Sequence, residues 1–324
     1  MLWTPALASL REAFHQAEIH TLTYASNAAV LKNLSMVNVQ HVLQTKGGGE
    51  LMRKLWSFRG EKFDWILGFH ATTSLCRWAW LSGAKRRVLH HHSRQYTPRG
   101  SLAVPRAGAL EDVITRDYRV LEAMGLTAHR LPTKLEISPE ESRQAEEMMC
   151  AEIERMGGRK DLPRYLFLPG GSYSLKRYPK EQWLPLAEKM REEKQYQPVV
   201  IADEALSKEL GLRADCDRLR LPLLDRANLR QAITLISRGA RAFSNDSAPG
   251  HIAVALGVRT SFAFGPGCIG DFHPYDRKQH PLFRIAVDCR ASGPRDDEAF
   301  QYCTVQECAH HRCMRDLKID LNQL

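Results

Sequence analysis

The sequence contains no uninterrupted run of about 18 apolar residues, which is the minimum for a membrane-spanning helix. Its first residues also lack the basic, apolar and small-residue order of a secretory signal peptide. From these two absences we expect a cytoplasmic protein without a transmembrane segment. Disulfide bonds are not expected in that compartment, although the chain contains 8 cysteines.

Cysteine pairs with the Cys-x2-Cys spacing of zinc knuckles are also missing. The last three cysteines, Cys303, Cys308 and Cys313, are instead separated by runs of four residues, with His310 and His311 between the second and the third. This C-terminal Cys/His cluster has two interpretations: a zinc site, or thiols that are buried or merely close together. Because the paired spacing is absent, we predict no bound metal.

Aromatic residues do not alternate with the basic residues, which argues against a site for single-stranded nucleic acid. The net charge of +9 nevertheless suits an anionic partner, which can be nucleic acid, a phospholipid surface or a phosphorylated glycolipid. A solvated basic loop is the other interpretation. Much of the excess charge lies in the first half, at Lys85, Arg86, Arg87, His90, His91, His92, Arg94, Arg99 and Arg106.

With 324 residues, the chain is long enough for two domains that each have a core. The second half alternates strand and helix patterns, which is typical of a parallel sheet covered by helices on both faces. Its strands are expected at residues 165–168, 198–202, 218–221, 240–243 and 260–264. A charged helix over Pro139–Arg155, followed by Gly157-Gly158, indicates a boundary near residue 160 and therefore domains 1–160 and 161–324.

The first half begins with a helix, over Thr4–Phe14, and continues with a strand over Glu18–Tyr24. A Rossmann-like domain normally opens with a buried strand ahead of its first helix, so the first strand of this domain is missing. Either the start is assigned too far downstream, which we favour because the covering helix is intact, or the domain lacks that strand. We also expect a loop at residues 94–106 and a strand at 131–137.

Residues 240–257 join a small apolar strand end to an apolar helix through Asn245-Asp246-Ser247. Such a turn places unpaired N–H groups and the positive end of a helix dipole at the carboxyl edge of a parallel sheet, where a phosphate fits. We expect the N–H groups of Ser247 and Ala248 to contact an anion and Asp246 to cap the helix. His251, in the first helical turn, either reaches the ligand or is a core histidine. An ordinary strand-to-helix connection is the plainer interpretation.

A second strand, at residues 165–168, is followed by Gly170-Gly171 and by two adjacent cations, Lys176 and Arg177. Glycines let a ligand approach the backbone closely, and the cations can neutralise a diphosphate. Ser172 and Ser174 could donate hydrogen bonds to phosphate or sugar, although serines are also common in turns. Because both motifs follow strands of one parallel sheet, we predict that they form one nucleotide site at its carboxyl edge.

Three motifs are together specific enough to indicate a family: Gly-Gly-Ser-x-Ser-x-Lys-Arg-Tyr-Pro from Gly170, Asn-Asp-Ser-Ala-Pro-Gly-His from Asn245, and Phe-Gly-Pro from Phe264. They resemble the family 9 glycosyltransferases, the ADP-heptose:lipopolysaccharide heptosyltransferases and their relatives. The resemblance covers most of the chain, including Phe63–Gly68 and Cys313–Arg315. It implies an α/β fold in the GT-B arrangement, with two Rossmann-like domains facing a cleft, and inverting transfer without a required metal.

The resemblance also implies roles for single residues. Lys176, and secondarily Arg177, would stabilise the charge that builds on the departing diphosphate. The family more often has glycine at the position of Ala248 and a larger apolar residue at that of Gly250. The ADP-sugar would bind through Ser172, Ser174, Lys176, Arg177, Asp246, Ser247, Ala248 and His251.

In inverting transfer the acceptor hydroxyl loses a proton to a general base. The family's base is an aspartate in a Gly-Asp loop whose place falls ahead of Met1, and neither Asp64 nor Asp271 matches it. The leading hypothesis is transfer of a heptose from ADP-heptose to the anionic lipopolysaccharide core, on the cytoplasmic face of the inner membrane. A non-catalytic nucleotide-sugar-binding relative is the alternative. A basic nucleic-acid-binding protein, with salt-dependent binding, is a third hypothesis that no recognised reader motif supports.

Overall fold

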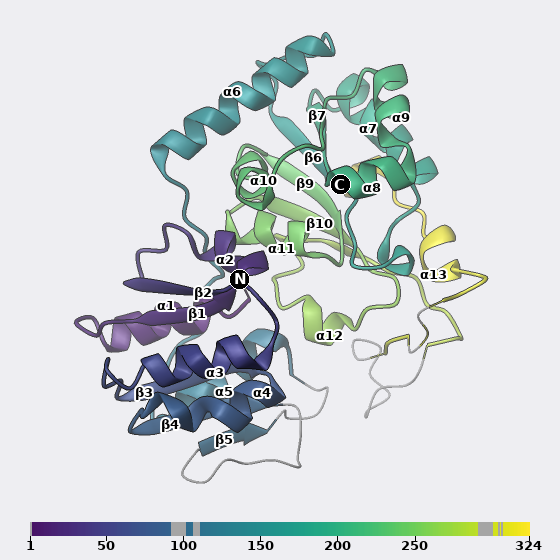
Figure 1. Cartoon of the computed structure of the whole chain (residues 1–324). Coiled ribbons are helices and arrows are strands. Elements are labelled where there is room, and N and C mark those ends of the chain that lie inside the picture. Colours follow the sequence, from purple (N-terminus) through teal and green to yellow (C-terminus); the bar gives the residue numbers. More distant parts are fainter. Residues whose placement is uncertain (1, 92–101, 106–110, 291–300, 304, 306) are drawn as a thin grey trace. The chain divides into compact units, whose positions relative to one another are not determined.

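The computed structural model describes residues 2–91, 102–105, 111–290, 301–303, 305 and 307–324. The chain divides into two compact units, residues 1–133 (unit 1) and 134–324 (unit 2), and each contains parallel strands and helices (Figure 1). Within the described residues, no helix combines the length and the apolar character that a bilayer crossing requires. The basic residues His92, Arg94, Arg99 and Arg106 lie outside the described residues.

Unit 2 is built on a parallel sheet in the order β11-β10-β9-β6-β7-β8. The chain starts at β6, adds β7 and β8 on one side, and returns to add β9, β10 and β11 on the other. The loops after β6 and β9 therefore leave the sheet side by side, where open parallel sheets bind ligands. The strands are β6 (Arg164–Leu168), β7 (Gln197–Ile201), β8 (Leu223–Leu224), β9 (Arg241–Asn245), β10 (Arg259–Ala263) and β11 (Leu282–Phe283).

Buried apolar residues run continuously along the central strands of unit 2, as expected where helices cover both faces. Leu166 and Phe167 of β6 and Val199 and Val200 of β7 are almost completely buried. The helices are α6 (Pro139–Arg155), α7 (Lys180–Glu193), α8 (Glu204–Leu210), α9 (Leu212–Leu219), α10 (Leu229–Ile236), α11 (Ala248–Ala255), α12 (Ile269–Phe272) and α13 (Arg312–Arg315), with 3-10 turns η2 (Ser174–Lys176) and η4 (Leu321–Gln323).

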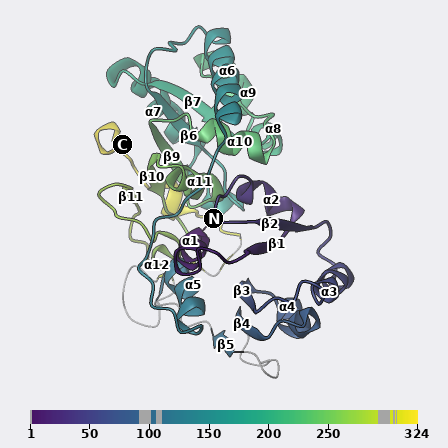
Figure 2. The same cartoon turned by 90° about the vertical axis from the view of Figure 1, so that its left-hand side faces the viewer.

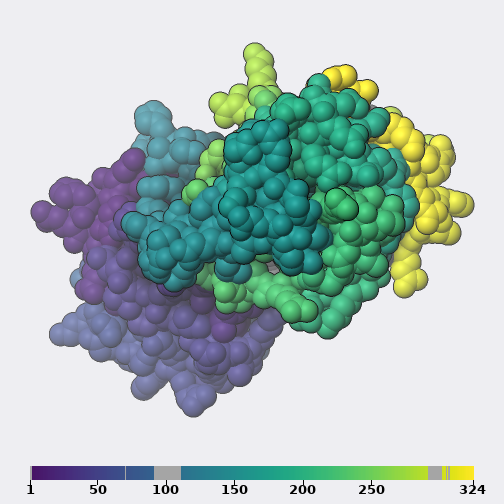
Figure 3. All heavy atoms as spheres, turned by 90° about the horizontal axis from the view of Figure 1, so that it is seen from above, coloured from purple at the N-terminus to yellow at the C-terminus, as the bar shows by residue number. Residues whose placement is uncertain are grey.

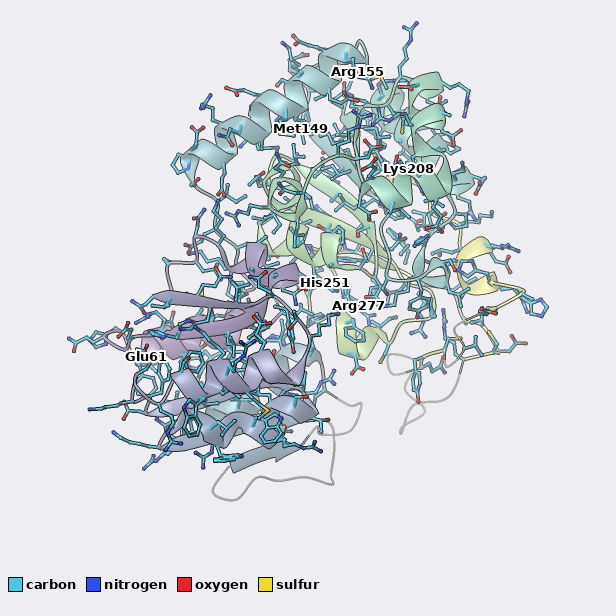
Figure 4. The ribbon with its side chains drawn as sticks, in the orientation of Figure 1. Glu61, Met149, Arg155, Lys208, His251 and Arg277 are labelled. Carbon is cyan, nitrogen blue, oxygen red and sulfur yellow. The ribbon has the colours of Figure 1, made fainter. Side chains whose placement is uncertain are left out.

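Helix α6 belongs to unit 2, so the division of the chain falls between Thr133 and Lys134 instead of near residue 160. Ala145, Met149 and Ile153 recur every four residues along α6 and are buried on one face, which packs on α10. The helix covers part of the surface of unit 2 (Figure 3), and Met149 is labelled in Figure 4.

Ion pairs along the length of α6 join it to other parts of unit 2. Arg230 of α10 lies 2.7 Å from Glu141, and Arg238 lies 2.7 Å from Glu146. Glu146 also pairs with Arg164 at the start of β6. Burial raises the pKa of Glu146, but the two guanidinium groups outweigh burial and lower it to about 2. Glu146 is therefore a carboxylate at neutral pH.

Unit 1 contains two parallel sheets among the described residues, β1-β2 and β3-β4-β5 (Figure 2). Ala6, Leu7 and Leu10 of α1 pack with Tyr118 and Leu121 of α5 in its main core. The elements are α1 (Thr4–Ala13), β1 (His20–Tyr24), α2 (Ala25–Leu31), β2 (Val39–Leu43), α3 (Gly48–Ser57), β3 (Trp65–Ala71), α4 (Thr73–Trp78), η1 (Ala79–Ser82), β4 (Arg86–His91), β5 (Leu102–Pro105) and α5 (Val113–Glu122).

The strand order of unit 1 parallels that of unit 2. In unit 2, β6 lies between β7 and β9, and α7 connects β6 to β7. In unit 1, α1 precedes β1 as α7 precedes β7, so β1 and β3 correspond to β7 and β9. Among the described residues, β1 and β3 belong to separate sheets.

Two expected strands are wrong. Residues 131–137 form no ladder, because the N–H of Leu131 bonds to the Tyr118 hydroxyl and that of Leu135 to the carbonyl of Ala255. Residues 218 and 219 instead end α9, whose Leu212, Cys216 and Leu219 have helical spacing, and Arg220 is its C-cap residue. The strand follows as β8.

Part of the expected loop at residues 94–106 is a strand. Leu102–Pro105 form β5, which pairs in parallel with β4. The other residues of that loop, 94–101 and 106, lie outside the described part of the chain.

Candidate functional site

Three loops meet at the carboxyl edge of the unit 2 sheet. Residues 169–179 follow β6, residues 246–247 follow β9, and residues 264–268 follow β10. Because β10, β9 and β6 are neighbouring strands, these three loops leave adjacent strand ends. We call them the β6, β9 and β10 loops. The first two are the glycine-rich and Asn-Asp-Ser motifs of the sequence.

Lys176 connects the β6 loop to the β9 loop. It ends η2, and its Nζ donates a hydrogen bond to Oδ2 of Asp246 at 2.6 Å. The ammonium group also lies 5.5 Å from the ring centre of Phe272 and 5.8 Å from that of Tyr173. The lysine side chain is 17% exposed, so solvent and ligands can reach it. The loops therefore hold one accessible positive charge where they meet.

Asp246 is a buried anion that orients this lysine. Its side chain is 4% exposed. Burial raises its pKa, but the interactions with His251 and Lys176 outweigh burial and hold the pKa below its ordinary value. His251 Nε2 lies 3.8 Å from Oδ1 of Asp246, and His251 Nδ1 lies 2.7 Å from the Tyr275 hydroxyl. His251 is therefore buried between Asp246 and Tyr275. It is labelled in Figure 4.

Helix α11 begins at Ala248, earlier than the sequence indicated. Ser247 is its N-cap residue, so the expectation that Asp246 caps this helix is wrong. The physical reason is that the carboxylate of Asp246 faces Lys176 instead. The first N–H groups of a helix have no intrahelical acceptor. Anion contact through the N–H groups of Ser247 and Ala248 stays a prediction, and the Ala248 side chain is exposed.

Asn245 ties the β9 strand to the β6 loop. Its Nδ2 donates to the carbonyls of Pro169 at 2.9 Å and Gly170 at 3.1 Å, and its Oδ1 accepts from the N–H of Tyr178 at 2.9 Å. The amide therefore fixes both ends of the loop that carries Lys176. Sequence reasoning included Asn245 in the motif but gave it no role.

We expect Asn245→Ala to lower the melting temperature by several degrees. The substitution leaves a buried N–H and two carbonyls without their partner, at about 1 to 3 kcal/mol for each unsatisfied group. Differential scanning calorimetry measures the shift. Asn322→Ala, which removes only an exposed bond from Lys194, is the control and should be close to neutral. Equal melting of both variants would contradict this role.

Arg177 does not point to the same place as Lys176. Its Nη1 lies 2.6 Å from Glu209 in α8, and its Nε donates to the carbonyl of Gly171 at 3.4 Å. The arginine therefore supports the glycine turn from the side of α8. Ser172 and Ser174 are exposed, and neither hydroxyl bonds to another described residue. Their contacts with a donor stay predictions.

Two glycines allow close packing in this site. A Cβ on Gly267 in the β10 loop would lie 2.3 Å from Oδ2 of Asp246. A Cβ on Gly250 in α11 would lie 2.5 Å from the Phe262 ring and 2.7 Å from the Ser244 hydroxyl. The larger apolar residue that the family often has at Gly250 would therefore not fit this chain without a shift of β9 or β10.

Gly267→Ala is expected to weaken the Lys176–Asp246 pair, because the new methyl group takes the position of the carboxylate oxygen. We expect a lower melting temperature together with weaker nucleotide binding, measured by calorimetry on one sample. Gly49→Ala is the matched control, since a Cβ at Gly49 meets no atom within 4 Å. Unchanged nucleotide affinity in Gly267→Ala would mean that Asp246 has no part in nucleotide binding.

Residues near the C-terminal end of the sequence hold the β6 loop through two hydrogen bonds. His311 Nε2 forms a hydrogen bond of 2.8 Å with the carbonyl of Leu175, and the Tyr178 hydroxyl donates to the carbonyl of Leu317 at 3.1 Å. Met314 and Leu317 are buried in the core of unit 2. The last residues lie along the side of that unit (Figure 3).

The C-terminal Cys/His cluster lines one cavity of about 380 Å³, together with Cys289, which the sequence interpretation left out. The eight cysteines are free thiols. Burial raises the pKa of the Cys313 thiol, an effect that Arg290 only partly opposes. In the described part of the chain, no three His, Cys, Asp or Glu side chains are arranged to hold a metal ion. The cluster members that line the cavity are Cys303, Cys308, His310, His311 and Cys313.

Comparison with known proteins identifies the family. The sequence model of glycosyltransferase family 9 (heptosyltransferase) matches residues 56–296. The chain belongs to this family. The expectation of a family 9 glycosyltransferase is therefore confirmed. No curated protein sequence is significantly similar to the chain.

Three solved structures are similar to this family 9 glycosyltransferase. A family 9 glycosyltransferase from Veillonella parvula superposes with a TM-score of 0.75 at 19% identity, covering 87% of this chain and 81% of that one. E. coli ADP-heptose LPS heptosyltransferase II gives 0.68 at 20% identity, covering 88% and 87%. E. coli heptosyltransferase WaaC with ADP gives 0.63 at 14% identity, covering 87% and 88%. At these identities the similarity shows the fold, which confirms the expected α/β class of GT-B type.

Several residues of the glycosyltransferase site carried no recognised signal in the sequence. Phe272 and Tyr275 follow the β10 loop closely, but nothing in the sequence shows that they turn back to Lys176 and His251. Of the two aspartates rejected as base, Asp64 is exposed and pairs with Lys85 at 2.6 Å. Asp271 is buried in α12. As in the sequence analysis, we assign no residue of this chain as the general base.

Proposed function

We propose that this family 9 glycosyltransferase moves a heptose from ADP-heptose to the lipopolysaccharide inner core, with inversion and without a metal ion. We place the reaction at the cytoplasmic face of the inner membrane. The observation that carries the proposal is the junction of the β6 and β9 loops, where Lys176 is held beside the start of α11. The neighbours named for ADP-heptose and for ADP support the choice of donor.

The proposed chemistry needs a positive charge at the leaving group. The acceptor hydroxyl attacks the anomeric carbon, the bond from that carbon to the diphosphate oxygen breaks, and ADP leaves with the electron pair. An ammonium group has three donors, and Lys176 uses one of them on Asp246. The other two can bind the diphosphate as its negative charge grows. Asp246 holds the lysine in place, while the hydroxyl proton passes to the general base.

Thermal-shift measurements with ADP, UDP and GDP test the donor site. A ligand at about a hundred times its dissociation constant adds roughly 2.7 kcal/mol to stability, which raises the melting temperature by several degrees. We expect a shift with ADP alone. An equal shift with UDP or GDP would contradict the proposed donor, and no shift with any nucleotide would contradict the site.

Transfer itself is tested by mass spectrometry of the core acceptor after incubation with ADP-heptose, with and without EDTA. We expect one added heptose and an unchanged rate in EDTA. Binding of ADP without any product would instead support the non-catalytic alternative.

A further inference from the structure

Two tryptophans of unit 1 are exposed to solvent. Trp56, in the last turn of α3, is 58% exposed, and Trp80, in η1, is 48% exposed. Single exposed apolar residues are common, so the position of the two relative to each other matters. α3 and η1 are neighbours, and Leu55 and Leu81 pack in the same core cluster beneath them. The two tryptophans are therefore on adjacent helical segments.

Each tryptophan has an arginine three positions earlier. Arg53 precedes Trp56, and Arg77 precedes Trp80, and both arginines are exposed. Arg53 and Trp56 share one face of α3, because residues three apart on a helix lie on the same face. Arg77 lies in α4, and Trp80 lies in η1, which follows α4 directly.

Arg59 connects the two segments. Its guanidinium group lies over the Trp56 ring, 4.9 Å from the ring centre. Its Cγ lies beside Gly83, where a Cβ would be 3.5 Å away, and Gly83 directly follows η1. We call Arg53, Trp56, Arg59, Arg77 and Trp80 the Arg/Trp surface.

The arginines of this surface are not held in ion pairs within the described chain, although the charge of Arg53 acts on nearby Glu50. Arg53, Arg59 and Arg77 form no ion pair with any carboxylate of the described residues, whereas arginines of unit 2 such as Arg164 and Arg230 are paired. Residues 50–87 contain eight Lys and Arg against three Asp and Glu, a net +5 out of +9 for the chain. The surface therefore combines uncompensated cations with exposed indole rings.

We propose that the Arg/Trp surface docks unit 1 on an anionic phospholipid bilayer. Arginine binds phosphate groups through paired N–H donors, and tryptophan is the side chain that prefers the boundary between headgroups and acyl chains. The inference rests on the proposed function, because a lipid-linked acceptor lies in such a bilayer. Nucleic acid fits less well, since Arg59 already covers a face of the Trp56 ring on which a base would stack.

Flotation of the full chain with vesicles tests the proposal. We expect binding to vesicles of phosphatidylcholine mixed with phosphatidylglycerol, and much weaker binding to phosphatidylcholine alone. Arg53→Ser combined with Arg77→Ser should weaken binding about 25-fold, from about fivefold for each cation near an anionic surface. Trp56→Ala combined with Trp80→Ala should weaken it at least about tenfold. Phe14→Ala and Arg143→Ser remove an exposed aromatic and an exposed arginine elsewhere and should leave binding unchanged.

Equal binding to both kinds of vesicle, no binding to either, or full binding by both double variants would overturn the proposal. Tighter binding to single-stranded DNA than to vesicles would replace it with a nucleic-acid surface. Quenching of tryptophan fluorescence by doxyl-labelled lipid needs no variant, so it decides the question even if a double variant misfolds, and no quenching would refute docking.

Transfer to a core acceptor without its lipid anchor separates this inference from the proposed function. We expect the same rate from the unmodified chain and from both double variants. If the unmodified chain transfers no sugar, the proposed function is wrong. Vesicle binding then still tests the docking proposal separately.

Discussion

Replacing Lys176 with alanine is expected to lower the rate of sugar transfer about 10²- to 10³-fold, as removal of a preorganised charge at a leaving group typically does. The lysine is the cation that links the β6 and β9 loops, and its partner Asp246 fixes its position at 2.6 Å. Single-turnover kinetics with saturating ADP-sugar measures the chemical step directly. Lys208→Ala is the control, because Lys208 is 75% exposed on α8 and, among the described residues, its ion pair is with Glu204 on the same helix.

Loss of Lys176 also leaves the buried Asp246 without its cation, which destabilises a protein by itself. The double variant Lys176→Ala/Asp246→Asn removes that unpaired charge. We expect it to recover most of the melting temperature and none of the rate. Recovery of transfer in the double variant would mean that the single variant failed through stability, and that Lys176 has no part in the chemistry.

A fragment of residues 134–324 is expected to fold, whereas a fragment of residues 161–324 is not. The shorter fragment loses α6, whose Met149 and Ile153 are completely buried and contribute about 1.5 to 3 kcal/mol each. It also removes the carboxylates that pair with Arg230 and Arg164, whose side chains are largely buried. Together these losses are of the order of the whole stability of a domain, about 5 to 15 kcal/mol.

Circular dichroism during heating distinguishes the two fragments. We expect a cooperative transition for residues 134–324 and none for residues 161–324. Glu140→Ser in the longer fragment is a control on the same helix, because its pair with Arg143 is exposed and contributes little. A cooperative transition in the shorter fragment would show that α6 is dispensable for folding of the sheet.

Local patterns predicted most of the fold. Buried strands such as β6 and β9 are short apolar runs between turn residues, and helices such as α6 and α10 begin at Ser138 and Asn228, whose caps are visible in the sequence. The predictions failed where the outcome depends on partners distant in sequence. Residues 131–137 have strand composition but no neighbouring strand, and α6 joins unit 2 through contacts with α10, β8 and Arg164 that its own sequence does not show.

The sequence predicted the loops of the candidate site but not the contacts between their side chains. The glycine turn and the Asn-Asp-Ser turn follow strands, which is enough to bring Lys176 near Asp246. Which side of each loop a side chain takes depends on tertiary packing, and the sequence does not contain that information locally. Arg177, adjacent to Lys176, turns to Glu209 for this reason, and Asp246 serves the lysine instead of the helix.

The attachment of the C-terminal residues behind η2 has a genetic consequence. His311 and Leu317 hold the β6 loop through Leu175 and Tyr178, although they lie 136 and 139 residues later in the sequence. A stop codon or frameshift at the codon of His310 would leave every residue of the three loops intact and still remove this support. Such alleles are therefore expected to score as nulls in a complementation assay, although they retain all three loops.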